Sequence, residues 1–364
     1  MTAVFDPRAF SCDWAEARAK FVDAARRAGA VHRAWPHPLA GPAGEALSVD
    51  TAWLGPRDAD RVLVVISGTH GVEGFCGSGP QVGLLRGDSG LALPARTAAL
   101  LIHGINPHGW AWLRRVTEEN VDLNRNWVDF SRPVPENPGY AALHPHLAPA
   151  SLEPDALAAA DAAQAAYAAE HGAHAARVAA SSGQYTHPDG VFYGGSGPTW
   201  ARRTSEAILA ECVGRARTVA IVDMHTGLGP YGYGEPICNH APGSDRVERA
   251  RAWWGDSVTE PLLGTSSSQE KWGLSEFGYE RALAHADIAF VALEFGTYPE
   301  AQGRRVLRDD HWLHAHGDPR GAAAAAIKTA IRDHFYPPHD DWKEMVLFRS
   351  WQVWRQGLAG LAAS

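Results

Sequence analysis

The most constraining feature of this sequence is a short apolar run that ends abruptly in polar residues. Residues 61–66, Arg-Val-Leu-Val-Val-Ile, are rich in β-branched side chains, and Gly68 follows them closely. A run of this kind is typical of a strand buried on both faces of an α/β sheet. His70 and Glu73 come next, in a glycine-rich loop. Open α/β sheets carry their sites at the carboxyl ends of strands, so we expect both side chains in a site.

His70 and Glu73 are residue types that bind divalent metal ions. An imidazole and a carboxylate three residues apart can contact one ion, and catalytic zinc sites combine two histidines and one glutamate with an open position. The same spacing also arises by chance, in which case His70 is a loop residue and Glu73 a solvated carboxylate. The pair alone does not decide between these interpretations.

Two later segments repeat the pattern of an apolar strand followed by a polar residue. Residues 218–224 lead to His225, and residues 288–293 lead to Glu294. Three strands that each deliver a polar residue at the same end are much rarer by chance than one. The repetition therefore favours a shared site.

The rest of the chain predicts alternating helices and strands. Residues 47–53 alternate in polarity and predict a half-exposed strand at a sheet edge. The pattern also predicts a strand at 97–103 and helices at 11–28, 76–85, 318–335 and 341–358. Residues 154–180 are alanine-rich and predict a long surface helix without chemistry of its own. We expect a single domain over residues 1–364, with an alanine-rich helical insertion near 150–182.

Composition argues against several classes of partner. A net charge of −8 and a pI near 6.1 disfavour nucleic acid. No apolar run approaches the about 18 residues that span a membrane, and residues 1–20 carry charges where a signal peptide needs an apolar stretch. Four widely spaced cysteines fit free thiols in a reducing compartment. We therefore expect a cytoplasmic protein with no membrane or nucleic-acid partner, and a homo-oligomer stays open.

Five motifs, in order, resemble the zinc carboxypeptidase family, the carboxypeptidase A-like metallopeptidases. They are His70-Gly-Val-Glu73, Asn106-Pro-His-Gly109, Asp122-Leu-Asn-Arg-Asn-Trp127, Met224-His225 with Pro230-Tyr231-Gly232, and Leu293-Glu294-Phe295. The resemblance covers about residues 63–297, and His108 departs from the family's Asn-Pro-Asp-Gly turn. Without the family's usual prepeptide and secretion signal, the chain would belong to an intracellular bacterial branch. Amidohydrolases of the succinylglutamate desuccinylase and aspartoacylase type, which remove acyl groups from acidic amino acids, share much of the pattern.

The resemblance implies a fold and a catalytic centre. The fold is α/β, with a mixed twisted sheet of about eight strands covered by helices. One zinc ion per chain is held by His70, Glu73 and His225. Glu294 acts as general base toward water, and Arg114 or Arg115 stabilises the oxyanion.

The resemblance also implies residues that contact the substrate. Asn124 and Arg125 receive its terminal carboxylate, because the guanidinium fork matches two oxygens. Tyr279 falls where the family places a mobile tyrosine, and Tyr231 and Tyr193 are alternatives. Asp223 either orients a zinc-bound imidazole or is an ordinary carboxylate at a strand end.

Three functions stay open on the sequence alone. The leading one is zinc-dependent hydrolysis of an amide bond next to a residue with a free carboxylate, in a small peptide. The first alternative is deacylation of an N-acyl amino acid, which a closed pocket would favour and a wide one would not. The second is a zinc or ligand-binding protein without turnover, and Glu294 argues against it because such a protein needs no base.

Overall fold

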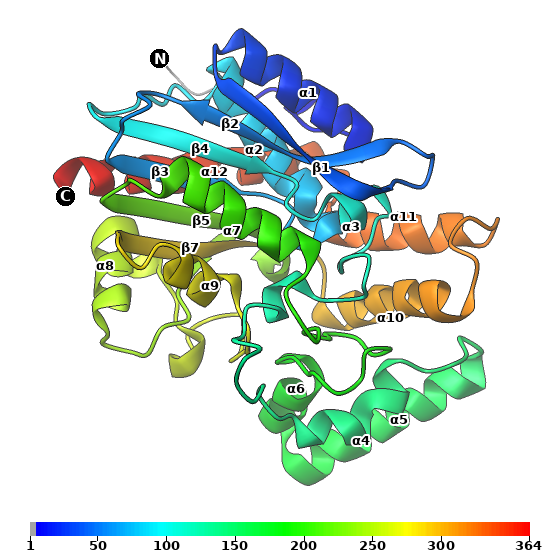
Figure 1. Ribbon diagram of the computed structural model, residues 1–364. Coiled ribbons are helices and arrows are strands. Elements are labelled where there is room, and N and C mark those ends of the chain that lie inside the picture. The colour runs from blue at the N-terminus through cyan, green and yellow to red at the C-terminus, as the bar shows by residue number, and fades with distance from the viewer. Residues whose placement is uncertain (1–4) are drawn as a thin grey trace.

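The computed structural model describes residues 5–364, and a single mixed sheet forms the centre of this part of the chain (Figure 1). Its seven strands run in the order β1-β2-β4-β3-β5-β7-β6. β3, β5 and β7 are parallel neighbours, as are β3 and β4, whereas β1, β2 and β6 add antiparallel pairs. The predicted mixed α/β sheet is confirmed, with seven strands in the described residues where about eight were expected. The strands are β1 (Val31–Ala40), β2 (Ala46–Leu54), β3 (Arg61–Ile66), β4 (Thr97–His103), β5 (Thr218–Tyr231), β6 (Gly234–Ile237) and β7 (Asp287–Gly296).

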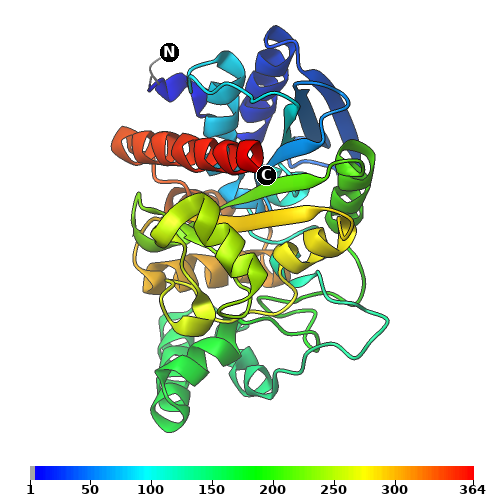
Figure 2. The same cartoon turned by 90° about the vertical axis from the view of Figure 1, so that its left-hand side faces the viewer.

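Helices cover both faces of the sheet, which explains the continuous apolar runs of the parallel strands (Figure 2). In β3, Leu63 and Val65 pack on one face, whereas Val62, Val64 and Ile66 pack on the other. The first face is covered by α1 (Trp14–Arg27), α2 (Gly74–Arg86), α8 (Asp245–Trp254) and α12 (Asp340–Ala363). The second face is covered by α7 (Trp200–Val213) and α9 (Ser275–Ala282). The central strands are therefore fixed on both sides, and only their ends are free to build a site.

Two predictions about single elements are wrong. The strand expected at a sheet edge, β2, lies inside the sheet because β1 pairs with its other side. The alanine-rich segment is not one long helix but two, α5 (Pro154–His171) and α6 (Ala173–Ser181). Gly172 lies between them with a φ of 88°, a left-handed value that favours glycine and ends α5.

The remaining helices gather beside the sheet, toward the lower right of Figure 1. They are α3 (Pro107–Ala111), α4 (Pro138–Leu147), α10 (Glu300–His316) and α11 (Ala324–Phe335), with short 3₁₀ turns at Pro7–Ala9, Gly71–Glu73, Leu123–Arg125, Gly255–Ser257 and Pro261–Leu263. α4 and α6 share a small core of their own around Tyr140, Leu143 and Ala179. Within residues 5–364, every helix is too short or too polar to cross a membrane.

Candidate active site

Three segments bring the predicted polar residues together at one end of the parallel strands. His225 in β5 lies opposite Glu294 in β7 in the strand register. His70 and Glu73 follow β3 in the loop that leads into α2. This loop packs closely on the turn around Gly109, because a Cβ added at Gly71 would lie 2.1 Å from the Gly109 carbonyl carbon. The Asn106-Pro-His-Gly segment therefore holds the His70 loop in place.

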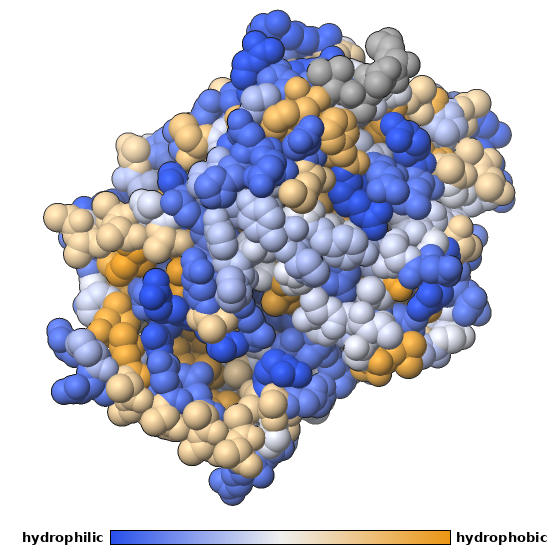
Figure 3. All heavy atoms as spheres, turned by 180° about the vertical axis from the view of Figure 1, so that it is seen from behind, coloured by the Kyte–Doolittle hydropathy of each residue, from blue (hydrophilic) through white to orange (hydrophobic). Residues whose placement is uncertain are grey.

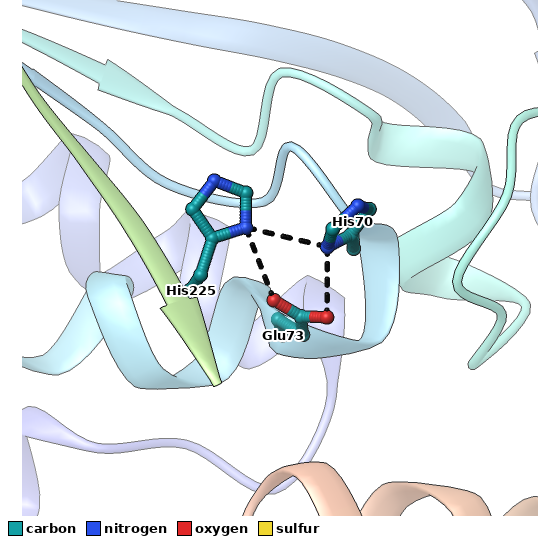
Figure 4. A group of neighbouring side chains, drawn as sticks. All are labelled: His70, Glu73 and His225. Atoms are coloured by element: carbon teal, nitrogen blue, oxygen red, sulfur yellow. Dashed lines mark hydrogen bonds and ion pairs between the residues drawn. The ribbon is translucent and has the colours of Figure 1, made fainter. Parts of the chain in front are cut away.

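His70, Glu73 and His225 form a compact buried group (Figure 4). The His70 Nδ1 atom lies 2.8 Å from Glu73 Oε1, and His225 Nδ1 lies 3.4 Å from Glu73 Oε2. The two Nδ1 atoms are 3.3 Å apart, so both imidazoles direct the same nitrogen toward one point. Within residues 5–364 this is the one group of three or more His, Cys, Asp or Glu side chains that could hold a metal ion.

Each histidine of this group contacts a second carboxylate with its other nitrogen. His225 Nε2 lies 3.1 Å from Asp223 Oδ2, and His70 Nε2 lies 3.2 Å from Asp122 Oδ1. Arg115 Nη2 also lies 2.7 Å from His70 Nε2. An imidazole that binds a metal through Nδ1 carries its proton on Nε2, so Asp122 is then the acceptor. A carboxylate on the far nitrogen fixes the ring orientation of metal ligands, and both histidines have one.

The charges of the group favour a bound cation. Burial alone would raise the pKa of Glu73, but the nearby histidines and Arg115 hold it well below its usual range. Burial alone would lower the pKa of His225, but Asp223 and Glu73 raise it to about 10. The negative charge of the carboxylates therefore has a larger effect on His225 than burial has, and a divalent cation would balance this charge. Two imidazoles and a carboxylate are also the ligand types that zinc prefers in catalytic sites.

Glu294 lies beside this group and borders the same cavity. Its side chain is 8% exposed, and its Oε1 atom accepts a hydrogen bond of 3.1 Å from the Leu228 backbone N–H. Burial and the charge of Glu73 raise the pKa of Glu294. A carboxylate with a raised pKa in a cavity is typical of a general base or acid.

The adjacent arginines point in different directions. Arg115 Nη1 donates to Glu73 Oε1 at 3.0 Å, and its Nε donates to Asp122 Oδ2 at 3.1 Å. Arg114 instead contacts Asp310 at 3.3 Å and Asn120 at 3.2 Å, away from the metal group. Of the two candidates for the oxyanion, the structure therefore brings only Arg115 into the cavity.

Asn124 and Arg125 border the cavity, as expected for residues that contact a ligand. Asn124 Oδ1 accepts a bond of 2.8 Å from the Ser275 N–H. Arg125 is 1% exposed, and its Nη atoms donate to the carbonyls of Asn124 and Ser181, both at 2.8 Å. Its Nε–H has no partner among the described residues. A buried donor without a partner is costly, and a ligand oxygen would satisfy it.

A family model covers residues 10–349 of the chain and carries the description "Protein of unknown function (DUF2817)". The chain belongs to the DUF2817 family. A comparison with curated proteins gave no match.

Solved structures similar to this DUF2817 chain include three with sequence identities of 12%, 17% and 13%. Bovine thrombin-activatable fibrinolysis inhibitor, in complex with a tick carboxypeptidase inhibitor, matches 91% of this chain and 99% of its own, with a TM-score of 0.44. Succinylglutamate desuccinylase from Chromobacterium violaceum matches 88% and 74%, with a TM-score of 0.34. An aspartoacylase family protein from Mesorhizobium loti matches 79% and 66%, with a TM-score of 0.38.

Tyr279 does not reach the cavity of this DUF2817 protein. It lies on α9 in the core on the second face of the sheet, 1% exposed, with its ring centroid 4.8 Å from that of Trp127. The alternatives Tyr193 and Tyr231 do not border the cavity either. The prediction for Tyr279 was based on its spacing along the chain, but the residue at that position is buried in a helix. We therefore assign no tyrosine to cover a substrate.

The cavity has a volume of about 710 Å³ and extends from the metal group to the alanine-rich helices. Its wall includes Ala168 of α5, Ala176 of α6 and Leu307 of α10, so the alanine-rich segment that the sequence left without chemistry forms one side of the site. Seen from behind, a hollow lies at the lower left of Figure 3, where hydrophobic residues gather.

Three further residues of the site were not predicted. Asp122 belongs to the Asp122–Trp127 motif, in which only Asn124 and Arg125 were given a role. Its contact with His70 depends on the conformation of a loop, which the sequence pattern does not predict. Phe192 lies between two guanidinium groups, with its ring centroid 5.6 Å from Arg115 and 5.8 Å from Arg125. Lys271 borders the cavity from the loop before α9. The sequence indicated only that Phe192 and Lys271 lie in segments without regular secondary structure.

Proposed function

We propose that this protein is a zinc-dependent hydrolase that cleaves an amide bond next to a residue with a free carboxylate. The observation that carries the proposal is the group of His70, Glu73 and His225 at the strand ends, with Glu294 beside it in the same cavity. The two imidazoles direct their Nδ1 atoms toward one point, and each has a carboxylate at its Nε2 atom. This arrangement is far more specific for metal binding than the short sequence motif.

His70, Glu73 and His225 are the residues that would hold zinc, one ion per chain. When bound, zinc supplies Lewis-acid chemistry, which activates water and polarises a carbonyl. The protein's own part is to keep the three side chains oriented. Asp122 and Asp223 serve this purpose, and Asp223 is itself held by Thr69 at 2.7 Å and Ser275 at 2.9 Å.

Glu294 would move the proton. The Leu228 N–H fixes its Oε1 atom, and the raised pKa makes the carboxylate a stronger base than an exposed glutamate. It would accept a proton from the attacking water and deliver it to the leaving nitrogen. A binding protein without turnover has no use for such a residue, which supports the enzyme over the non-catalytic alternative.

Arg115 and Arg125 would provide positive charge for two different parts of the substrate. Arg115 lies against Glu73, so it is placed to stabilise negative charge that develops at the reacting carbonyl. Arg125, with Asn124, would receive the terminal carboxylate, because both residues border the cavity and the Arg125 Nε–H has no partner among the described residues. These roles follow the direction of each side chain and are part of the proposal.

The size of the cavity favours a peptide over a small acyl amino acid. About 710 Å³ is in the upper half of the range in which drug-sized ligands bind, and the space continues outward to the alanine-rich helices. A deacylase of the desuccinylase or aspartoacylase type is the alternative, and both would act on a substrate with a free carboxylate. We also propose one catalytic domain with a helical insertion, in the cytoplasm, where its free cysteines would stay reduced.

The test compares hydrolysis of a substrate with a free terminal carboxylate and of the same substrate amidated. We expect the amide to lose most of its kcat/KM. Arg125→Ala should cost at least about tenfold on the free acid, and little more on the amide, because the contact it removes is already missing there. Arg132→Ala is the matched control, since the Arg132 side chain is 81% exposed and lies outside the cavity. Equal hydrolysis of acid and amide would contradict the proposal.

A further inference from the structure

Lys271 is a cation in the cavity that forms no ion pair with a carboxylate of the described residues. It borders the same space as Glu294 and Arg125. Its Nζ donates to the hydroxyl of Ser268, and it takes part in no ion pair within residues 5–364. An ammonium that is partly buried and contacts only a neutral hydroxyl is a costly arrangement, which a counter-ion arriving with a ligand would relieve.

Three of the cations that line the cavity differ in how their charge is balanced. Arg115 contacts Glu73 and Asp122, so its charge is neutralised within the protein. Arg125 contacts carbonyl oxygens, and Lys271 contacts a hydroxyl. Burial, and after it the charge of Arg125, lower the pKa of Lys271 to about 8. Of these three cations, Arg125 and Lys271 form no ion pair among the described residues.

We infer that Lys271 is a specificity residue that binds a second carboxylate of the substrate, so that the residue next to the scissile amide is acidic. This inference rests on the proposed function, in which Arg125 receives the terminal carboxylate. A side-chain carboxylate of the aspartate or glutamate type would then accept hydrogen bonds from Lys271 and from the neighbouring hydroxyl of Ser268. A dicarboxylate would neutralise both Arg125 and Lys271, whereas a neutral side chain would leave Lys271 without a counter-ion.

The competing role for Lys271 is to shift the pKa of Glu294, because the charges of the two residues interact. In that case Lys271 would influence every substrate alike, because the general base takes part in every turnover. A role in specificity would instead affect only the substrate with the second carboxylate. The two roles are separated by a pair of substrates that differ in one functional group.

The first experiment measures kcat/KM for matched substrates that end in glutamate or glutamine. The wild-type protein should prefer glutamate by at least about tenfold, the effect of one charge-assisted hydrogen bond. Lys271→Met should abolish this preference, and Lys271→Arg should retain part of it. Arg305→Met, which removes the same charge from an exposed position at the outer cavity wall, should preserve the preference. An equal loss on both substrates in Lys271→Met, or the same result for Arg305→Met, would overturn the inference.

A second experiment does not depend on turnover. Glutarate and butyrate are titrated into the zinc-loaded protein by calorimetry, because they differ by one carboxylate. Glutarate should bind at least about tenfold more tightly to the wild type, and Lys271→Met should remove the difference. If the protein hydrolyses neither substrate but still shows this difference, the proposed reaction fails and the binding role of Lys271 stands. Equal binding of the two acids to the wild type would refute that role.

Discussion

The histidines of this protein fall into two kinds of surroundings. His70 and His225 lie at the strand ends, each with a carboxylate on the nitrogen that faces away from the cavity. His103, also at a strand end, is 1% exposed, contacts Ser78 Oγ at 2.9 Å and stacks on Phe21. Burial lowers the pKa of His103 to about 3, whereas Asp223 and Glu73 overcome burial at His225 and raise its pKa to about 10.

The difference shows what separates a proposed metal ligand from a packing residue in this fold. His225 and His103 are both buried and both follow an apolar run of a strand, so neither burial nor the preceding sequence distinguishes them. The neighbours do: carboxylates surround His225, and a hydroxyl and an aromatic ring surround His103. A buried histidine next to two carboxylates is suited to bind a cation, and a buried neutral one is suited to fill space.

The largest expected effect is the loss of the metal ion when a histidine of the site is replaced, and not when a packing histidine is replaced. His225→Ala should lose its zinc and all zinc-dependent turnover, because two protein ligands hold zinc poorly. His103→Gln should keep about one zinc per chain and show only a loss of stability. Metal analysis of the purified variants, with thermal unfolding alongside, measures both. A full zinc content in His225→Ala would break the comparison.

The next effect concerns two buried glutamates. Glu294→Gln should keep zinc and lose about two to four powers of ten in kcat, because it removes the proposed base. Glu276 is also buried with a raised pKa, about 7, but it accepts hydrogen bonds from Asn239 and does not border the cavity. Glu276→Gln should therefore stay within a few-fold of the wild-type rate. Similar rates for the two variants would mean that burial, and not the place beside the metal group, governs the effect.

The adjacent arginines sharpen the same distinction between site and packing. Arg115→Met should lower kcat by about a hundredfold, as expected for the loss of one group that stabilises a developing charge. Arg114→Met should change kcat little and lower the melting temperature, because Asp310 would remain buried with one partner fewer. Steady-state rates and thermal melts of both variants give the answer. A large loss of kcat in Arg114→Met with normal stability would exchange the two roles.

The sequence predicted the parts of the site that lie on regular structure. His225 and Glu294 were proposed because each follows an apolar run, and two parallel strands in register bring them together. His70 and Glu73 were found because their loop directly follows a third strand. The order and direction of the strands convert a pattern along the chain into neighbours in space.

The parts that failed depend on loops and on the direction of single side chains. Nothing in the spacing distinguishes Arg114 from Arg115, since a turn decides which one faces the cavity. Tyr279 is at the expected distance from Glu294 along the chain, but the short helix α9 directs it into the core. Lys271 is a single basic residue in a loop, and only the packing of that loop against the cavity gives it meaning.

The smallest expected effect is the contribution of the packing residue His103 to the dependence of stability on pH. Above a pH of 6.5, the usual pKa of histidine, His103 is neutral in both the folded and the unfolded chain and contributes nothing to the pH dependence. Below that value the unfolded chain takes up a proton that the folded protein refuses until the pH is near 3, so stability falls as the pH falls. One such group gives a slope of at most about 1.4 kcal/mol per pH unit. Chemical denaturation of wild type and His103→Gln between about pH 6 and pH 4.5 should therefore show a shallower slope in the variant, whatever its absolute stability. Parallel slopes would mean that His103 is protonated in the folded protein and belongs with the histidines of the site.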